Sequence, residues 1–342
     1  MKILIISPNL HFGGASTANR NIATMLSKAG HEVVYADEFL KDSGESDYIY
    51  SDLPVYRNRI TKKYKVIDHI RKNGYDMVIC GMPQMMAFYL LHLLYLRVFH
   101  KVRLGIIFHS LCVAKDLKGR VFEYMIALST IIAHKLFYVS EYTKKSWEEY
   151  ALVRMSSAKP YIIHNAVPGV GVKHAPAARP RIAFVGRLSS EKRPQLFCSY
   201  AEALCDRYKF IVWGDGPMAD HLREEYGSKV TFMGYENAPE KIYAQIDILM
   251  MTSEFENCPM VILESRTYGV PVITVNVGGI SEILKEGYNG LYFKDTDSFT
   301  DLQSKIEDII SSYSTYQENC LNSVITLENS AVLWDKAVKS TK

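Results

Sequence analysis

The chain has 342 residues, of which 48% are hydrophobic and 23% charged, a composition that suits globular domains with their own cores and excludes disordered and fibrous proteins. Its formal net charge of +3 is too small to indicate a strongly basic, nucleic-acid-binding domain. The six cysteines form no CxxC pair, so we expect a reducing, cytoplasmic setting.

The first half of the chain alternates apolar strand patterns with helical patterns. The opening MKILIISP is a short strand pattern that lacks the long apolar core of a signal peptide. Gly13 and Gly14 follow this strand and precede a helix expected from about Thr17 to Gly30. Further strands are expected at 33–36, 77–80, 104–108, 136–139 and 161–163, with helices at 84–99, 119–134 and 141–151. This alternation predicts a doubly wound α/β domain over residues 1–166.

A change in composition marks the start of a second domain. Residues 167–180 are rich in Gly, Pro and Ala, which predicts a linker. A new series of strands and helices starts at Arg181, and we expect the second domain to extend over residues 167–325.

The segment from Ser253 to Leu284 carries the clearest functional pattern. A buried strand at 248–251, a loop at 252–259 and a helix at 260–268 are expected here. The free amides and positive dipole end of that helix favour an anion over Cys258, Pro259, Met260 and Val261. Glu264 would then accept hydrogen bonds from a ribose and Glu256 from sugar hydroxyls, although two glutamates without such context are more often solvated surface residues.

Several motifs occur together and in a characteristic order. They are HNAV at 164–167, FVGRLSSEKRP at 184–194, WGDGP at 213–217, EFENCPMVILES at 254–265, YGVPVIT at 268–274 and GGISEI at 278–283. This set resembles the retaining family 4 glycosyltransferases, with their E-x7-E region. The resemblance implies the α/β GT-B architecture, in which two Rossmann-like domains have parallel sheets facing each other across a cleft. It also implies that residues 326–342, anchored by Trp334, form a helix that crosses back to the first domain.

The resemblance assigns roles to individual residues of the chain. Arg187 and Lys192 would neutralise the donor diphosphate, His109 would contact the transferred sugar, and Glu256 would orient it. The implied catalytic residues are His109, Glu256, Arg187 and Lys192, and the implied donor-binding residues are Gly13, Gly14, Arg187, Lys192, Tyr235, Glu256, Asn257, Cys258, Pro259, Met260, Val261 and Glu264. The family more often has glycine and an aromatic residue where this chain has Asn257 and Cys258, and alanine in place of Ser265.

The implied reaction is transfer of a sugar with retention of its anomeric configuration. The expected donor is a UDP-hexose or UDP-N-acetylhexosamine, and the expected acceptor is a hydroxyl of a lipid-linked saccharide in bacterial surface polysaccharide synthesis. No metal is expected, because two cations replace it and Asp295-Thr296-Asp297 lies where carboxylates serve a turn and a helix start. The alternatives are a nucleotide-sugar epimerase and a non-catalytic nucleotide-sugar-binding partner. A nicotinamide-dependent oxidoreductase is disfavoured by the missing GxGxxG fingerprint.

Two segments of the first domain bear on membrane contact. Residues 57–72 hold seven Lys or Arg against one acid, Asp68, which predicts peripheral contact with the anionic inner leaflet. Residues 85–99 form an apolar run that is short for a membrane span. A buried helix is the simpler interpretation of this run, and a membrane-facing surface is the alternative.

Overall fold

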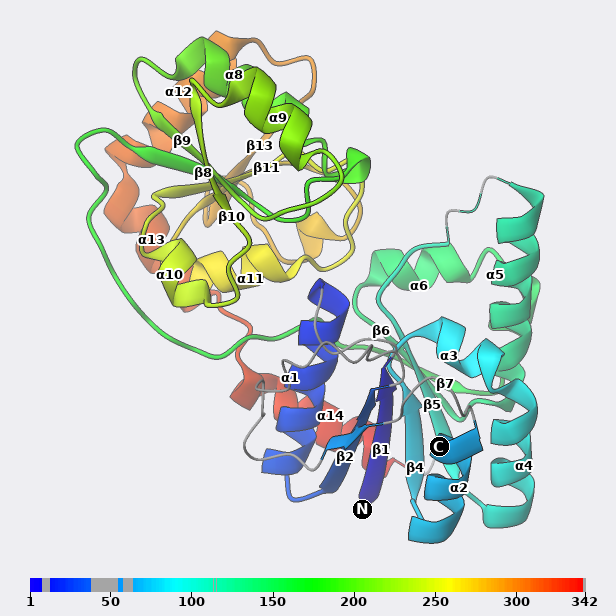
Figure 1. Cartoon of the computed structure of the whole chain (residues 1–342). Coiled ribbons are helices and arrows are strands. Elements are labelled where there is room, and N and C mark those ends of the chain that lie inside the picture. The colour runs from blue at the N-terminus through cyan, green and yellow to red at the C-terminus, as the bar shows by residue number, and fades with distance from the viewer. Residues whose placement is uncertain (8–12, 38–54, 58–63, 113, 115, 341–342) are drawn as a thin grey trace. The chain divides into compact units, whose positions relative to one another are not determined.

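The computed structural model describes residues 1–7, 13–37, 55–57, 64–112, 114 and 116–340. They divide into two compact units (Figure 1). Unit 1 consists of Met1–Ala166 and Leu327–Lys342, and unit 2 of Val167–Thr326. Residues 58–63 of the basic segment, and the side chains of Arg57 and of residues 64–67, lie outside the description.

The described strands of unit 1 form a seven-stranded parallel sheet in the order β3-β2-β1-β4-β5-β6-β7. The inner strands are buried on both faces, which explains their unbroken apolar sequences. The strands are β1 (Lys2–Ser7), β2 (Glu32–Asp37), β3 (Val55–Arg57), β4 (Met77–Cys80), β5 (Arg103–Phe108), β6 (Lys135–Tyr138) and β7 (Lys159–Ile162).

The helices of unit 1 differ from the expected ones mainly at their ends. The helix predicted from Thr17 begins at Gly14, and the helix predicted over 84–99 is broken at Tyr89. None of the described helices is both long and apolar enough to cross a membrane. The helices are α1 (Gly14–Lys28), α2 (Tyr64–Asn73), α3 (Pro83–Phe88), α4 (Leu90–His100), α5 (Leu117–Ser129), α6 (Glu141–Trp147), α7 (Ala151–Arg154) and α14 (Leu327–Lys339).

Unit 2 repeats the doubly wound plan. Its described strands form a six-stranded parallel sheet in the order β10-β9-β8-β11-β12-β13. The strands are β8 (Arg181–Val185), β9 (Lys209–Trp213), β10 (Val230–Gly234), β11 (Ile248–Met251), β12 (Val272–Val275) and β13 (Gly290–Phe293). The helices are α8 (Pro194–Leu204), α9 (Ala219–Tyr226), α10 (Pro239–Tyr243), α11 (Met260–Thr267), α12 (Phe299–Ser311) and α13 (Tyr313–Asn322).

The segment 167–180, predicted as a linker, is fastened to unit 2. Its Val170 amide donates to the Thr267 hydroxyl, and Gln317 donates to the carbonyl of His174. Asp247, which is fully buried, accepts from the Ala177 amide and from the Arg181 guanidinium. The segment is therefore part of the surface of unit 2.

The last helix, α14, returns to unit 1 and packs against α1 (Figure 1). Trp334 is buried and lies 4.6 Å from Phe137 between ring centroids. Asp335 contacts His31 at 2.8 Å. The expected crossing of the last helix back to the first domain is thus present.

Candidate functional site

The predicted donor residues of unit 2 follow strands that meet at one edge of its sheet. β8 and β11 are neighbours, and the strand order reverses between them. Loops at such a reversal lie at the carboxyl ends of parallel strands, where α/β proteins bind ligands. The loop after β8 carries Arg187 and Lys192, and the loop after β11 carries Glu256.

Lys192 and Glu256 are in direct contact. Lys192 Nζ donates to Glu256 Oε1 at 2.6 Å, and the Ser253 hydroxyl donates to the same oxygen at 2.8 Å. Glu256 is 8% exposed, so its carboxylate is held by a cation where solvent screens little. Both contacts end on the same carboxylate oxygen, Oε1.

Backbone contacts fix the loop that bears Glu256. Gly278 has a φ of 62°, and a Cβ there would lie 1.8 Å from the Glu256 carbonyl oxygen. The Gly279 amide donates to the same carbonyl at 3.0 Å. The Thr252 hydroxyl donates to the carbonyls of Lys192 and Arg193, each at 2.9 Å. The loops after β8, β11 and β12 therefore position one another, and only glycine fits at 278.

A second glycine brings the WGDGP motif into the same assembly. Gly214 has a φ of 130°, and a Cβ there would lie 1.9 Å from the Gly186 carbonyl oxygen. The Leu188 amide donates to the Asp215 carbonyl at 2.9 Å. The loop that holds Arg187 and Lys192 is thus braced by the loop after β9.

Helix α11 begins directly after the loop that carries Glu256, and Glu264 is the fifth residue of this helix. Pro259 precedes the helix, and no side chain of the described residues caps it, so its first amides are available to an anion. Tyr243 donates to Glu264 Oε2 at 3.2 Å and also lies 3.1 Å from the Val261 carbonyl. Burial raises the pKa of Glu264, and the Tyr243 hydrogen bond opposes that rise.

The remaining predicted residues of unit 2 lie on loops after its strands and, for Met260 and Val261, in the first turn of α11. Arg187 is exposed, and its side chain has no ion pair within the described chain. Tyr235 is also exposed and donates to Asn237 at 2.5 Å in the loop after β10. Cys258, Pro259 and Met260 are buried, while Asn257 and Val261 are partly exposed. Asp295 of the DxD pattern accepts two hydrogen bonds from the Arg193 guanidinium. Asp297 accepts a hydrogen bond from the Lys294 amide, a contact typical of a turn.

In unit 1, His109 lies at the carboxyl end of β5 and contacts the helix that Gly13 and Gly14 begin. Its Nε2 lies 2.8 Å from Asn19 Oδ1 on α1, and because an amide oxygen only accepts, Nε2 carries the proton. Asn19 Nδ2 donates to the Gly81 carbonyl at 2.9 Å. Gly13 has a φ of 104° at the start of α1. His109 and the glycine loop are thus fixed relative to one another.

His109 is neutral near neutral pH. Burial lowers its pKa from 6.5 to about 4. A neutral imidazole can exchange hydrogen bonds with a sugar hydroxyl, but it contributes no positive charge.

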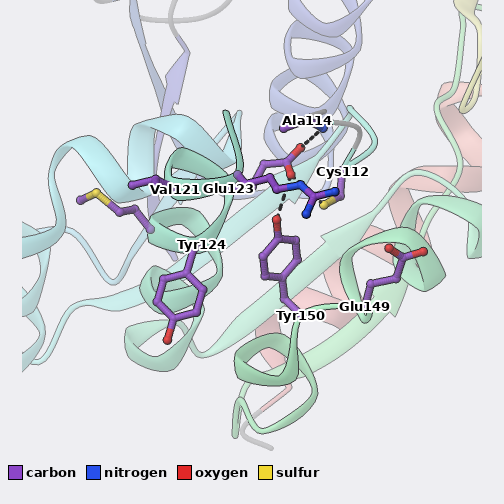
Figure 2. Close-up of a pocket in the computed structure, with 9 residues that line it drawn as sticks. Cys112, Ala114, Val121, Glu123, Tyr124, Glu149 and Tyr150 are labelled. Carbon is purple, nitrogen blue, oxygen red and sulfur yellow. Dashed lines mark hydrogen bonds between the residues drawn. The ribbon is translucent and has the colours of Figure 1, made fainter. Parts of the chain in front are cut away.

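A pocket of about 550 Å³ lies in unit 1, lined in part by α5. Figure 2 shows Tyr150 and Ala114 converging on the carboxylate of Glu123, which accepts at 3.0 Å from the Tyr150 hydroxyl and at 2.9 Å from the Ala114 amide. The Cys112 thiol donates to the same carboxylate at 3.2 Å, and burial with the nearby carboxylate raises its pKa to about 12. The pocket therefore combines a held carboxylate with the side chains of Val121 and Tyr124 from α5.

Four residues of these sites were not singled out by sequence reasoning: Asn19, Tyr243, Ser253 and Gly278. Asn19 shares the buried stripe of α1 with Ile22 and Leu26, and an amide at an apolar position was the signal for it. Gly278 belongs to the GGISEI motif, but the reason for a glycine there is its close approach to the Glu256 carbonyl, which the sequence does not show.

Two family profiles match the sequence, one in each half. Residues 12–168 match the profile described as Glycosyltransferase Family 4, and residues 179–312 match the profile described as Glycosyl transferases group 1. Together they extend over most of the chain.

Curated relatives are similar to part of the chain. The O-antigen biosynthesis glycosyltransferase WbnH of Escherichia coli is 29% identical over 181 residues, 52% of this chain and 52% of that protein. The Escherichia coli UDP-Gal:alpha-D-GlcNAc-diphosphoundecaprenol alpha-1,3-galactosyltransferase is 26% identical over 154 residues, 41% of this chain and 40% of that protein. The chain thus matches about half the length of these relatives or less.

A solved structure extends the similarity to the whole fold. Anabaena Alr3699/HepE in complex with UDP and glucose superposes with a TM-score of 0.82, covering 99% of this chain and 100% of that chain. The two sequences are 16% identical, so this likeness is one of fold.

Proposed function

Since this chain belongs to the glycosyl transferases of group 1 and family 4 and has their GT-B fold, we propose that it is a retaining, metal-independent hexosyltransferase. The proposed donor is a UDP-hexose or UDP-N-acetylhexosamine. The proposed acceptor is a hydroxyl of a lipid-linked saccharide in bacterial surface polysaccharide synthesis, a class that WbnH and the diphosphoundecaprenol-dependent galactosyltransferase support by similarity. The observation that carries the proposal is the Lys192–Glu256 pair at the sheet reversal of unit 2.

Unit 2 is assigned the donor. Arg187 and Lys192 would contact the diphosphate, together with the first amides of α11 across Cys258 to Val261. Glu264 would accept from the ribose hydroxyls, Glu256 from the sugar, and Tyr235 and Asn257 would border the nucleotide. Because Lys192 and Glu256 already hold each other, the donor would meet a site whose charges are in position before it binds.

Unit 1 is assigned the acceptor, with the Gly13-Gly14 loop and His109 near the reacting groups. The acceptor oxygen would form its bond to the anomeric carbon on the face from which the diphosphate leaves. The acceptor proton would pass to the departing phosphate oxygen, and the products would be the glycoside and UDP. Arg187 and Lys192 would stabilise the charge that grows on the diphosphate, which is why no metal is required. Neutral His109 would hold a sugar hydroxyl.

Peripheral contact with the anionic inner leaflet and a cytoplasmic location belong to the same proposal. They are supported by the basic segment 57–72 and by the membrane-bound nature of a lipid-linked acceptor.

The test is turnover by the purified chain with a panel of nucleotide sugars and a lipid extract as acceptor source. We expect release of UDP that depends on both substrates, resists EDTA and yields an α-linked product from an α-linked donor. The variant Glu256→Gln should lose most of the turnover while binding UDP normally, since it alters the contact to the sugar.

Other outcomes would favour the other functions. Conversion of the nucleotide sugar into its epimer without acceptor would identify an epimerase. UDP-sugar binding with no turnover under any acceptor would identify a non-catalytic binding partner. Loss of turnover in EDTA, restored by a divalent cation, would contradict the metal-independent mechanism.

A further inference from the structure

Helix α4 of unit 1 exposes a complete apolar stripe. Its exposed apolar side chains recur at the helical spacing i, i+3, i+4, i+7 and i+8, and Leu91 and Phe99 are 76% and 70% exposed. The opposite stripe, with Leu93 and Leu96, is fully buried. The exposed stripe consists of Leu91, Leu94, Tyr95, Val98 and Phe99. The buried-helix interpretation of 85–99 therefore accounts for only one side of α4.

Helix α5 has apolar side chains on its outer side as well as at the buried positions Ile126 and Ala127. Its buried side also contains the carboxylate of Glu123. Soluble proteins rarely expose contiguous apolar surface of this kind without a partner. The exposed apolar residues of α5 are Leu117, Val121, Phe122, Tyr124, Met125 and Leu128.

The two helices adjoin along one edge of unit 1, on the side away from α1 (Figure 1). Arg97 near the end of α4 donates to the Ile131 carbonyl just after α5, at 3.3 Å. The pocket around Glu123 opens at this edge, because Val121, Tyr124 and Met125 belong both to its lining and to the exposed apolar set. We call the exposed apolar residues of α4 and α5 the apolar face.

Among the described residues around the apolar face, cations outnumber carboxylates: exposed Asp116 precedes α5, and exposed Glu149 lines the adjoining pocket. Glu123 is the only acid in α4 and α5, and it is buried. Lys101 follows α4, and Lys118 and Arg120 lie on the first turn of α5, all three exposed. Helix α2, which contacts α4, ends in the exposed residues Arg71 and Lys72, and Arg71 pairs with Asp68 at 3.3 Å. An apolar face fringed by cations is the pattern of a helix surface that lies in an anionic membrane interface.

We infer that the apolar face docks on an anionic lipid bilayer, with the side chains of α4 and α5 in the interface and the fringe of Lys and Arg against the headgroups. The inference deepens the proposed function, since it rests on a lipid-linked acceptor for its purpose. A saccharide carried by such a lipid would then emerge beside the pocket that holds Glu123 (Figure 2). The docking surface thus lies on two described helices, α4 and α5.

The experiment is co-sedimentation of the full chain with vesicles of equimolar phosphatidylglycerol and phosphatidylcholine, without donor or acceptor. We expect binding that weakens with salt and is poor on pure phosphatidylcholine. The variant Leu91→Ser/Phe99→Ser should bind at least about tenfold more weakly, because both replaced side chains lose apolar burial. The variant Lys101→Asn/Lys118→Gln should lose about fivefold for each cation removed.

The matched control is Val332→Ser/Leu333→Ser, which removes two exposed apolar side chains of α14, away from the apolar face. It should bind vesicles like the wild type. Equal losses in the control and in Leu91→Ser/Phe99→Ser, or no binding by the wild type, would overturn the inference.

The main rival explanation is that a second copy of the chain covers the apolar face. Light scattering tests it, because a dimer that dissociates in Leu91→Ser/Phe99→Ser would mean that the face is a dimer interface. UDP binding by the same variants should stay unchanged, so failure on vesicles is separable from failure of the donor site.

Discussion

At the scale of single residues, the proposed donor site depends on the two side chains that hold the Glu256 carboxylate in place. Lys192 and Ser253 both bond to Oε1, and the pair lies where solvent screens little. A buried carboxylate without its cation is costly, so the two side chains act as one unit. The same residues are the ones the proposal assigns to the diphosphate and the sugar.

The exchange Lys192→Met tests that assignment. It removes a positive charge where negative charge develops, so kcat/KM should fall by about 10²- to 10³-fold, the range seen when one stabilising donor is lost. Steady-state kinetics with UDP-sugar and acceptor measure it. Lys173→Met is the control, because Lys173 forms only an exposed ion pair with Glu318 at 2.9 Å. Similar kinetics for the two variants would remove Lys192 from the mechanism.

His109 gives a prediction on pH. Its folded-state pKa of about 4 lies below the ordinary 6.5, so between those values the unfolded chain binds a proton that the folded chain does not. The free energy of unfolding should therefore rise with pH across this window, and acidification from 6.5 to 4 should cost up to about 3 kcal/mol through His109. Urea unfolding at several pH values measures the slope.

The variant His109→Gln should flatten that slope, since an amide does not titrate there. His221→Gln is the control, because His221 is a surface residue. A slope that is unchanged in His109→Gln would contradict the buried, neutral state of this imidazole.

At the scale of elements, the site is an assembly of loops rather than of side chains alone. The loops after β8, β9, β11 and β12 touch backbone to backbone, and glycines at these contacts let them approach closely. In unit 1, β5 and α1 are joined through His109 and Asn19. Each predicted role therefore depends on elements that carry no catalytic group.

Gly278→Ala should disturb the site through its neighbour. A methyl group would meet the Glu256 carbonyl at 1.8 Å, and the shift of the loop should cost on the order of 10²-fold in kcat. Gly287→Ala is matched to it, with a similar φ of 70° but open space at the Cβ. The control should lose only about 1–2 kcal/mol of stability from its backbone conformation. Equal kinetic losses in both variants would show that strain, and not the contact, matters.

Strand positions were predicted well because buried parallel strands have unbroken apolar sequences, as at Met77–Cys80 and Ile248–Met251. Helix limits were predicted less well, since the break at Tyr89 has no proline or glycine to announce it. The short strand β3 and helix α2 were missed within a charged region. Which side of α4 faces outward could not be read from the sequence, because apolar residues occur on both its buried and its exposed side. The pairing of Lys192 with Glu256 could not be predicted from the sequence either, because the contact joins loops that follow different strands.

At the scale of the whole molecule, each unit has its own core, and the chain closes unit 1 only with its last helix. Trp334 and Asp335 of α14 contact Phe137 and His31, which are far away in sequence. The predicted GT-B class is confirmed by the two parallel sheets and by the fold likeness to a structure that covers the full chain. The stability of unit 1 thus depends on α14.

Trp334→Ala should lower the free energy of unfolding of unit 1 by about 3–5 kcal/mol, the usual cost of removing a buried large aromatic side chain. Val332→Ala is the control on the same helix, and with Val332 69% exposed it should change stability by less than about 0.5 kcal/mol. Denaturant unfolding of both variants gives the comparison. A loss below about 1 kcal/mol for Trp334→Ala would mean that α14 contributes little to the core of unit 1.

The most direct test of the donor site is calorimetric titration of the chain with UDP, GDP, ADP and NAD, repeated with Glu264→Ala and with the exposed Glu240→Ala on α10 as control. We predict that one nucleoside diphosphate, UDP, binds the wild type and the control alike, and binds Glu264→Ala about tenfold or more weakly because the ribose loses a charged acceptor. Binding of no nucleoside diphosphate, or equal affinity for all three proteins, would contradict the account.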